Sequence, residues 1–266
     1  MTIEEKLNAL RRVMAEKQVD TYIVLSSDAH QSEYVGGYWK ARAYISGFTG
    51  SAGTVVVTRD KAACWVDGRY FLQGAEQLAG TEIELMKMGE PGVPTYEDWA
   101  IAETPAGGTM GVDGRTIGYG QAEALKPRLA KKQITLACKE DLIGMIWTDR
   151  PALPEAPIFD LPVSFAGESR GEKLSRLRNH MKEIGADYYL LASLEDSAWL
   201  LNYRGGDIQG TPVAYAYTLV GPKETVLFIE ECKVPQEMRE LLAADQIGVR
   251  PYGELPSYMQ GLEAAT

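Results

Sequence analysis

The alternation of apolar and polar positions predicts a helix and then strands at the start of the chain. Residues Ile3–Lys17 carry apolar side chains at helical spacing, and the apolar run TYIVL at 21–25 follows. Two β-rich runs, GTVVV at 53–57 and AACWV at 62–66, are separated by a short polar turn, which is typical of a hairpin. Helical and strand signals keep alternating as far as Trp147, so we expect a mixed α/β domain.

A proline-rich segment then interrupts this pattern. The sequence WTDRPALPEAPIFDLP at 147–162 contains four prolines and has almost no helical or strand periodicity. Because proline fixes φ and lacks a backbone donor, such a segment is typical of a connection between domains. We therefore predict a first domain over 1–150, a linker over 151–168 and a second domain over 169–266. A length of 266 residues also favours two domains over one.

The two predicted domains begin with the same helix. At an offset of 167 residues, EEKLNALRRVMAEKQVDTY aligns with GEKLSRLRNHMKEIGADYY, and half of the positions from 5 to 22 are identical to their partners. A potential capping box precedes each helix. The identical pairs include Leu7 with Leu174, Leu10 with Leu177, Met14 with Met181 and Asp20 with Asp187, and the capping residues are Thr2 with Glu5 and Ser169 with Glu172. The repeat predicts two domains of one architecture, each a mixed β-sheet flanked by helices.

The second copy continues like the first and then stops. An apolar strand, YYLLA, and two β-rich segments, PVAYAYTLV and ETVLFIE, follow its helix. A strand is expected near Ile247–Tyr252 and a helix over Leu255–Ala264, with no strand after it. We therefore expect the second domain to be incomplete at its C-terminal end.

Charge and cysteine content narrow the class of protein. With 37 acidic and 27 basic residues, the formal net charge is -10, which disfavours nucleic acid and anionic membranes as partners. The three cysteines, Cys64, Cys138 and Cys232, lie far apart and suit a reducing compartment. The N-terminus lacks the apolar core of a signal peptide, and no apolar run approaches membrane-spanning length, so we expect a cytoplasmic protein.

Few residues suggest chemistry. The chain has two histidines and neither a His-Glu-x-x-His nor a Cys-x-x-Cys element, so a self-contained zinc hydrolase is not expected. His180 is predicted to face solvent on the second repeat helix. His30 follows a strand end and is close to Asp28 and Glu33, which together could bind a metal. The alternative, which we favour, is that Asp28 caps a short following helix while His30 makes a local hydrogen bond.

Two further features lie at strand ends. The glycine-rich segment GFTGSAGT at 47–54 matches no phosphate-binding fingerprint, and a tight turn feeding the next strand is its expected role. Arg69 follows Asp67 and Gly68 between the strand AACWV and an expected helix. An arginine there can pair with a neighbour such as Asp67 or with the anionic group of a ligand, and the spacing alone leaves both open.

Seven segments in order along the chain resemble aminopeptidase P. They are SSDAHQSEY (26–34), ISGFTGSAGT (45–54), WVDGRYFLQ (65–73), LMKMG (85–89), EDW (97–99), WTDRP (147–151) and AWLLNYRGGDI (198–208). In that family, as in the related prolidases and creatinases, two N-terminal domains of similar topology precede a C-terminal pita-bread domain. The resemblance thus accounts for the internal repeat.

The resemblance also implies a function. Family members remove the N-terminal residue from peptides whose second residue is proline. They use two metal ions, usually manganese, that are held by two Asp, one His and two Glu of the C-terminal domain. None of these positions falls in this chain, so we expect no catalytic residue, metal or cofactor here and no activity in isolation. The implied roles are dimerisation and restriction of access to short proline-containing peptides. Arg69 resembles a residue that approaches the substrate. Asp28 and His30 match the family without a known catalytic role and are further candidates for substrate binding.

Two alternatives remain open. The same architecture without metal ligands serves as a peptide or histone binder in the large subunit of a eukaryotic histone chaperone, so the chain could be a stand-alone binding module for basic partners. A creatinase-like amidinohydrolase fragment shares the fold, but the segments SSDAHQSEY and WTDRP argue against it.

Overall fold

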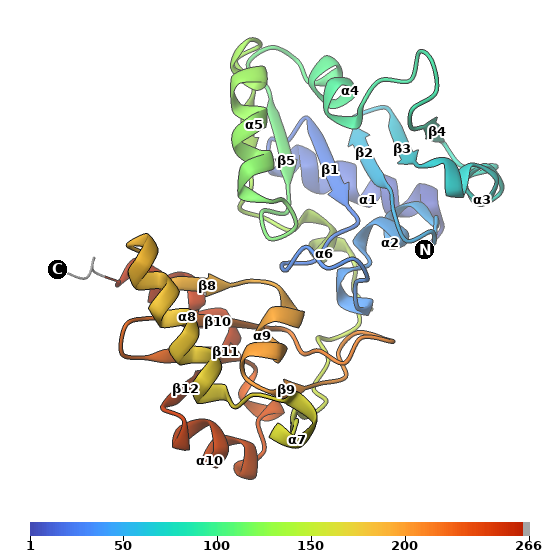
Figure 1. The fold of residues 1–266 in the computed structure, drawn as a ribbon. Helices are drawn as coiled ribbons and strands as arrows, with labels where there is room; N and C mark the ends of the chain where they lie inside the picture. The colour runs from blue at the N-terminus through green and yellow to red at the C-terminus, as the bar shows by residue number, and fades with distance from the viewer. Residues whose placement is uncertain (263–266) are drawn as a thin grey trace. The chain divides into compact units, whose positions relative to one another are not determined.

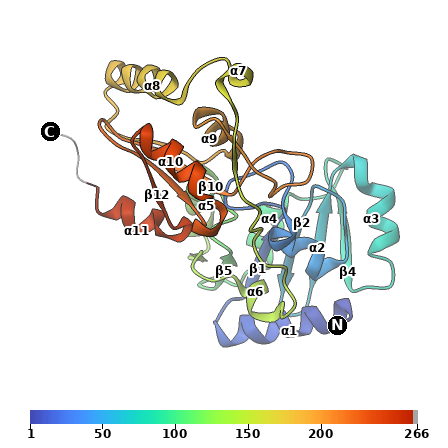
Figure 2. The ribbon, with the colours of Figure 1, turned by 90° about the horizontal axis from the view of Figure 1, so that it is seen from below.

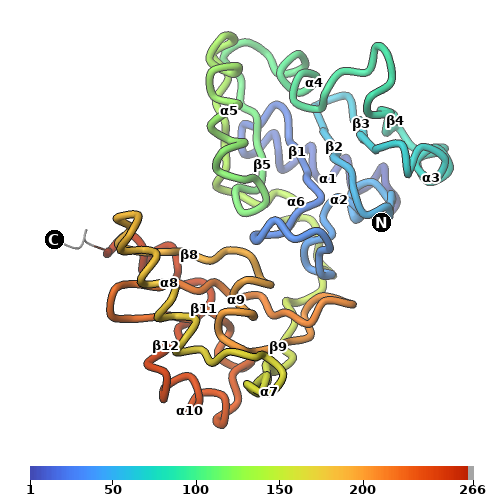
Figure 3. Tube along the Cα trace, in the orientation of Figure 1, coloured from blue at the N-terminus to red at the C-terminus, as the bar shows by residue number. Residues whose placement is uncertain are grey.

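The chain divides into two compact units with their boundary between Ala152 and Leu153. They are seen in a computed structural model that describes residues 1–262. Each unit is built on its own β-sheet with helices packed against it, as the sequence predicts (Figure 1). In the backbone trace of Figure 3, the first unit runs from blue to yellow-green and the second from yellow to red.

The first unit contains a six-stranded mixed sheet. Its strands are β1 (Thr21–Leu25), β2 (Thr54–Thr58), β3 (Ala62–Val66), β4 (Ile83–Lys87), β5 (Thr109–Val112) and β6 (Thr135–Ala137). They lie in the order β4-β3-β2-β1-β5-β6. The β1–β2 and β2–β3 pairs are antiparallel, and the β3–β4, β1–β5 and β5–β6 pairs are parallel. The predicted hairpin is therefore β2–β3.

Helices cover both faces of this sheet. They are α1 (Ile3–Glu16), η1 (Gly37–Trp39), α2 (Ala41–Ser46), η2 (Gly68–Tyr70), α3 (Phe71–Gln77), α4 (Tyr96–Glu103), α5 (Tyr119–Ala130) and α6 (Leu142–Ile146). One core joins α1, α2 and α6 to the sheet, and a second core joins α4 and α5 to the opposite face. Figure 2 shows α1 lying along the first of these faces. Since alternate residues of a strand point to opposite faces, each central strand contributes to both cores.

The second unit repeats the topology of part of the first. Its strands are β7 (Phe159–Asp160), β8 (Tyr189–Leu191), β9 (Tyr203–Arg204), β10 (Ala216–Val220), β11 (Thr225–Ile229) and β12 (Ile247–Arg250). Its main sheet has the order β12-β11-β10-β8, with antiparallel β8–β10 and β10–β11 pairs and a parallel β11–β12 pair. This arrangement matches β4-β3-β2-β1, and it confirms the two domains of similar topology.

Helices of the second unit also follow the repeat. They are α7 (Val163–Ala166), α8 (Arg170–Ile184), α9 (Leu194–Leu200), η3 (Glu231–Lys233), α10 (Gln236–Ala244), η4 (Tyr252–Glu254) and α11 (Leu255–Gln260). Helix α11 covers the start of the helix expected over Leu255–Ala264, and residues 263 and 264 lie outside the described part of the chain. No helix among residues 1–262 is long and apolar enough to cross a membrane.

The helices α1 and α8 form for the same local reasons. Thr2 with Glu5, and Ser169 with Glu172, each form the predicted capping box, in which side chain and backbone satisfy each other's donors. The apolar stripe of α1 is buried at Leu7, Leu10 and Met14, and that of α8 at Leu174 and Met181, while Leu177 is only half-buried. His180 lies on the exposed side of α8, as predicted.

A lysine at the equivalent position of α1 and α8 makes the same kind of contact in each unit. Lys6 donates to the carbonyl of Tyr44 at 2.9 Å and lies 4.2 Å from the centroid of that ring. Lys173, its partner in the repeat, donates to the carbonyl of Trp199 at 2.7 Å and lies 4.2 Å from the Trp199 ring centroid. In each unit this contact ties the first helix to the helix that follows the first strand of the repeat.

The predicted linker is partly folded onto the second unit. Trp147 stacks on Tyr44 at a centroid distance of 4.4 Å, which fixes the end of the first unit. Within the segment 151–168, β7 pairs with β9, α7 follows, and the backbone N–H of the buried Ile158 donates to the carbonyl of Lys233. The segment that connects the two units is therefore shorter than the linker over 151–168 that the proline content suggests.

The segment 205–215, which begins in the AWLLNYRGGDI motif, is held by a buried ion pair. Asp207 accepts from Lys233 and from the backbone N–H of Tyr215, and the side chains of Asp207 and Lys233 are 0% and 1% exposed. Removing one member of a buried pair leaves the other charge without compensation, so both residues are expected to be required for the stability of this unit.

We predict that Leu10→Ala destabilises the first unit by about 2–5 kcal/mol, because a fully buried side chain in the α1 core is replaced by a cavity. Arg12→Ala, on the exposed side of the same helix, should change stability by less than about 0.5 kcal/mol. Hydrogen exchange of the β1 amides measures both. Equal effects of the two variants would contradict the assigned orientation of α1.

Candidate functional site

Several loops of the first unit lie at the same end of the strands of its sheet. The C-terminal ends of β1, β3, β5 and β6 and the N-terminal end of β2 lie together, as the pairs Leu25 with Thr54, Thr54 with Trp65 and Ile23 with Val112 require. Ligands of open α/β sheets bind beyond the carboxyl ends of strands. We therefore treat this end of the strands, the carboxyl edge of the sheet, which carries Asp28, His30 and Arg69, as the candidate site.

Asp28 and His30 are buried within the loop that follows β1. Asp28 is 0% and His30 is 7% exposed. The Asp28 Oδ1 atom accepts from the backbone N–H groups of His30 and Ser32 at 2.9 and 3.0 Å, whereas Oδ2 has no hydrogen-bond partner among residues 1–262. No helix follows directly, since the next helical turn starts at Gly37, so Asp28 caps a turn rather than the short helix expected.

The glycine-rich segment forms a turn that is held by hydrogen bonds from the buried Arg42. The Arg42 guanidinium donates to the carbonyls of Phe48 and Gly50, and its Nε donates to the Ser26 hydroxyl at 2.8 Å. Arg42 is 5% exposed, and burial lowers the pKa of its guanidinium. At Gly50 an added Cβ would lie 2.9 Å from Tyr70 Cδ1 and closer still to Phe48, so only glycine fits there.

Arg69 lies at the surface beside this turn. Asp67 Oδ1 accepts from the Arg69 backbone N–H at 3.0 Å and from Nε at 2.9 Å, and Asp67 Oδ2 accepts from Nη2 at 2.7 Å. The hydrogen bond from the Arg69 side chain holds the pKa of Asp67 below its ordinary value. The Arg69 side chain is 68% exposed, and its guanidinium lies over the Tyr70 ring. The Tyr70 hydroxyl is 2.7 Å from the Ser51 hydroxyl. Of the two roles left open by the sequence, the local pair with Asp67 is present.

A second turn of the same sequence lies at the end of β5. Asp113 Oδ1 accepts from the Arg115 backbone N–H at 3.0 Å and from Nε at 3.0 Å, and Asp113 Oδ2 accepts from Nη2 at 2.7 Å. These are the contacts of Asp67 with Arg69, repeated after another Val-Asp-Gly-Arg sequence at 112–115. Gly114 is required by its close packing, because a Cβ there would lie 2.3 Å from the carbonyl oxygen of Cys138.

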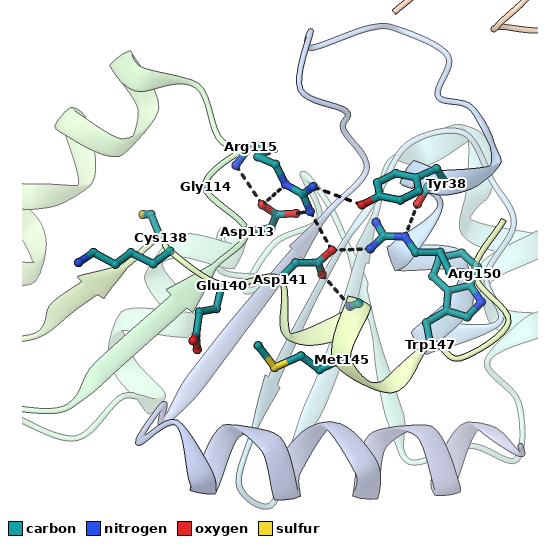
Figure 4. A pocket seen from close by; sticks show the side chains of 12 residues that line it. Tyr38, Asp113, Gly114, Arg115, Cys138, Glu140, Asp141, Met145, Trp147 and Arg150 are labelled. Carbon is teal, nitrogen blue, oxygen red and sulfur yellow. Dashed lines mark hydrogen bonds and ion pairs between the residues drawn. The ribbon is translucent and has the colours of Figure 1, made fainter. Parts of the chain in front are cut away.

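The second turn belongs to a network that lines a pocket of about 840 Å³ (Figure 4). Arg115 Nη2 also donates to Asp141 at 2.8 Å, and its Nη1 donates to the Tyr38 hydroxyl at 3.3 Å. Asp141 accepts from Arg150 as well, and Arg150 Cζ lies 3.8 Å from the centroid of the Tyr38 ring. Asp141 also caps α6 through the backbone N–H of Gly144. The network therefore joins β5, α6 and the WTDRP segment.

Sequence reasoning missed this second cluster. Asp141 lies 26 residues after Arg115 and 9 residues before Arg150 in the sequence, so no local spacing indicates that the three residues meet. One signal was present: the sequence Val-Asp-Gly-Arg occurs at 66–69 and again at 112–115, each time after a β-rich run.

Comparisons with known proteins assign the two units. Residues 6–140 match the Creatinase/Prolidase N-terminal domain family, and residues 149–266 match a second family with the same description. The chain belongs to the creatinase/prolidase N-terminal domain family. The two matched regions place one such domain in each structural unit.

Relatives of these creatinase/prolidase N-terminal domains are peptidases. The chain is 41% identical to Aminopeptidase P2 of Arabidopsis thaliana over 99% of its length and 39% identical to a probable Xaa-Pro aminopeptidase P of Neurospora crassa over 94%. It covers only 37% of each of those two proteins. The X-prolyl aminopeptidase of Caenorhabditis elegans, described as a cytosolic enzyme with a di-nuclear active site, matches 97% of the chain with a TM-score of 0.91 and 35% identity, and the chain covers 44% of it.

We predict that Asp141→Asn destabilises the first unit by about 1.5–3 kcal/mol, because two arginines lose the carboxylate that they share. The neighbouring Glu140→Gln removes only a pair with Lys17, both side chains of which are well exposed, and should cost about 1 kcal/mol or less. Hydrogen exchange of α6 and β5 compares the two variants. A loss from Glu140→Gln as large as that from Asp141→Asn would refute the central place of Asp141.

A titration tests the Asp67–Arg69 pair. Because the pKa of Asp67 is depressed, its pairing contributes above the ordinary carboxyl pKa and is lost as the pH falls through the lower folded value. Arg69→Gln should return the pKa of Asp67 toward its ordinary range, whereas Arg59→Gln, at the other end of the strands, should not. Carbon NMR of the carboxyl group measures the shift. An unchanged Asp67 titration in Arg69→Gln would show that the pair is absent in solution.

Proposed function

We propose that this chain forms the non-catalytic N-terminal portion of a metal-dependent Xaa-Pro aminopeptidase, an enzyme that releases the residue ahead of proline. The supporting observation is that almost the whole chain aligns, at about 40% identity, with 37% of the length of relatives bearing that name. Two creatinase/prolidase N-terminal domains account for that share. The remaining length of such a protein would hold the catalytic machinery.

The described residues of this chain offer no set of ligands for a metal ion. Among residues 1–262, no three His, Cys, Asp or Glu side chains gather at a spacing that could hold an ion. His30 is buried beside Asp28, and His180 lies on exposed α8 beside Glu183. We therefore place the two divalent ions of the proposed enzyme, for which manganese is our choice, outside this chain, and we assign no catalytic step to its residues.

The role that remains for the chain is selection of substrate and assembly. Arg69 is the candidate for contact with peptide, since it is exposed at the carboxyl edge of the first sheet and its orientation is fixed by Asp67. Asp28 and His30 are too buried to lie at the surface, and we assign them the support of the neighbouring loop. We also propose that the protein is a homodimer.

The proposed setting is the cytoplasm, with short proline-containing peptides as substrates. A relative described as cytosolic supports this location. The net charge of -10 argues against nucleic acid and anionic membranes as partners, because both carry the same sign of charge.

The proposal predicts that hydrolysis of an Xaa-Pro peptide with added manganese requires more than this chain. The product of the full open reading frame should cleave the peptide and lose activity when a chelator removes the metal, while the 266-residue chain should be inactive under the same conditions. Activity in the short chain would mean that the catalytic site lies within it. Inactivity of both proteins would refute the peptidase assignment and favour a stand-alone binding module.

A further inference from the structure

In both Asp-Gly-Arg turns the aspartate binds the arginine two residues later, an arrangement that we call the clamp. The two turns differ in which groups contact the rest of the arginine guanidinium. An arginine guanidinium carries five N–H donors, and the aspartate of each turn takes one from Nε and one from Nη2. The donors that remain are on Nη1 and the far side of Nη2, and they point away from the aspartate. This outer end of the guanidinium has the geometry that binds a carboxylate.

In the turn at 113–115 the outer end is filled. Arg115 Nη2 donates to the Asp141 carboxylate at 2.8 Å and Nη1 to the Tyr38 hydroxyl at 3.3 Å (Figure 4). The Arg115 side chain is 45% exposed. The molecule thus shows which groups a clamped arginine of this kind takes at its outer end: a carboxylate and a phenol.

In the turn at 67–69 the outer end is open. Among residues 1–262, the Arg69 side chain forms hydrogen bonds and an ion pair only with Asp67. The ring of Tyr70, the next residue, lies beside it, with its centroid 5.2 Å from Arg69 Cζ. This contact is with the ring, whereas Arg115 donates a hydrogen bond to the Tyr38 hydroxyl. Within the described part of the chain, the carboxylate that completes the arrangement around Arg115 has no counterpart around Arg69.

Hydrogen bonds hold the groups that surround Arg69. The Ser51 hydroxyl lies 2.7 Å from the Tyr70 hydroxyl, and either group can be the donor. When Ser51 donates, the O–H of Tyr70 is available to a ligand. The turn that carries Ser51 is fixed by the buried Arg42 through the carbonyls of Phe48 and Gly50. A site whose donors are held in place before binding loses little entropy on binding.

We propose that the outer end of the Arg69 guanidinium, together with the Tyr70 hydroxyl, binds the free C-terminal carboxylate of a short peptide, with Asp67 as the residue that positions Arg69. This inference rests on the proposed function and adds a determinant of substrate class to it. An enzyme with this site distinguishes short peptides with a free carboxylate from longer or blocked ones.

The test uses the full gene product and matched tripeptides, Xaa-Pro-Xaa, with a free or an amidated C-terminus. Because a charge-assisted hydrogen bond is lost with the amide, the unmodified enzyme should favour the free acid in kcat/KM by about tenfold to hundredfold. Arg69→Gln should bring that ratio close to one, with the loss in KM rather than in kcat, as expected for a contact that does not involve the reacting atoms. Arg69→Lys should restore part of the preference.

Positioning by Asp67 and donation by Tyr70 have separate tests. Asp67→Asn keeps the Arg69 guanidinium but loosens it, so the preference for the free acid should fall to an intermediate value. Tyr70→Phe should lower it by severalfold. The control is Arg59→Gln, which removes a similarly exposed arginine paired with Asp20 at the other end of the strands, and the preference should be unchanged.

Four outcomes would overturn the inference. Equal cleavage of the free and amidated peptides by the unmodified enzyme, or a preference that survives in Arg69→Gln, would refute the carboxylate site and leave the peptidase assignment intact. A change of molecular mass in Arg69→Gln, with the preference unchanged, would assign the partner carboxylate to another polypeptide. Failure of the unmodified enzyme to cleave either peptide would refute the proposed function itself, and the inference with it.

Discussion

The clamp between an aspartate and the arginine two residues later is the interaction on which the candidate site depends. It forms at the end of β3 and again at the end of β5, and in each case the aspartate binds both the backbone N–H and the side chain of its arginine. The Asp67–Arg69 pair is exposed, so its contribution to stability is small. Its effect is to fix the direction of a guanidinium that would otherwise sample many rotamers.

The same clamp has different consequences at its two locations. Around Arg115, long-range partners close the outer end and join β5, α6 and the WTDRP segment, which makes the cluster part of the architecture of the first unit. Around Arg69, the outer end is exposed at an edge where ligands of α/β sheets bind. One local motif thus supports structure in one place and offers a binding group in the other.

The fold was largely predictable because its determinants are local. Capping boxes and apolar stripes predict α1 and α8. The equivalent residues Lys6 and Lys173 also make equivalent tertiary contacts, so the sequence repeat is accompanied by a repeat in side-chain packing. The linker was less predictable, since proline content does not reveal that Ile158 is buried against the second unit.

The site was predictable only in part. Arg69 is recognisable as an arginine after a strand end, but the exposure of its outer end depends on which distant residues are absent from its surroundings. Asp141 and Arg150 come from far along the chain and meet Arg115 only through the sheet topology. The burial of Asp28 and His30 likewise follows from tertiary packing, which a motif does not record.

A crystal structure of the full gene product with an uncleaved proline tripeptide tests the account most directly. The account predicts that the peptide carboxylate lies within hydrogen-bonding distance of Arg69 Nη1 and the Tyr70 hydroxyl, with the Asp67 clamp intact. A peptide carboxylate bound elsewhere, or a carboxylate of another polypeptide on Arg69, would contradict it.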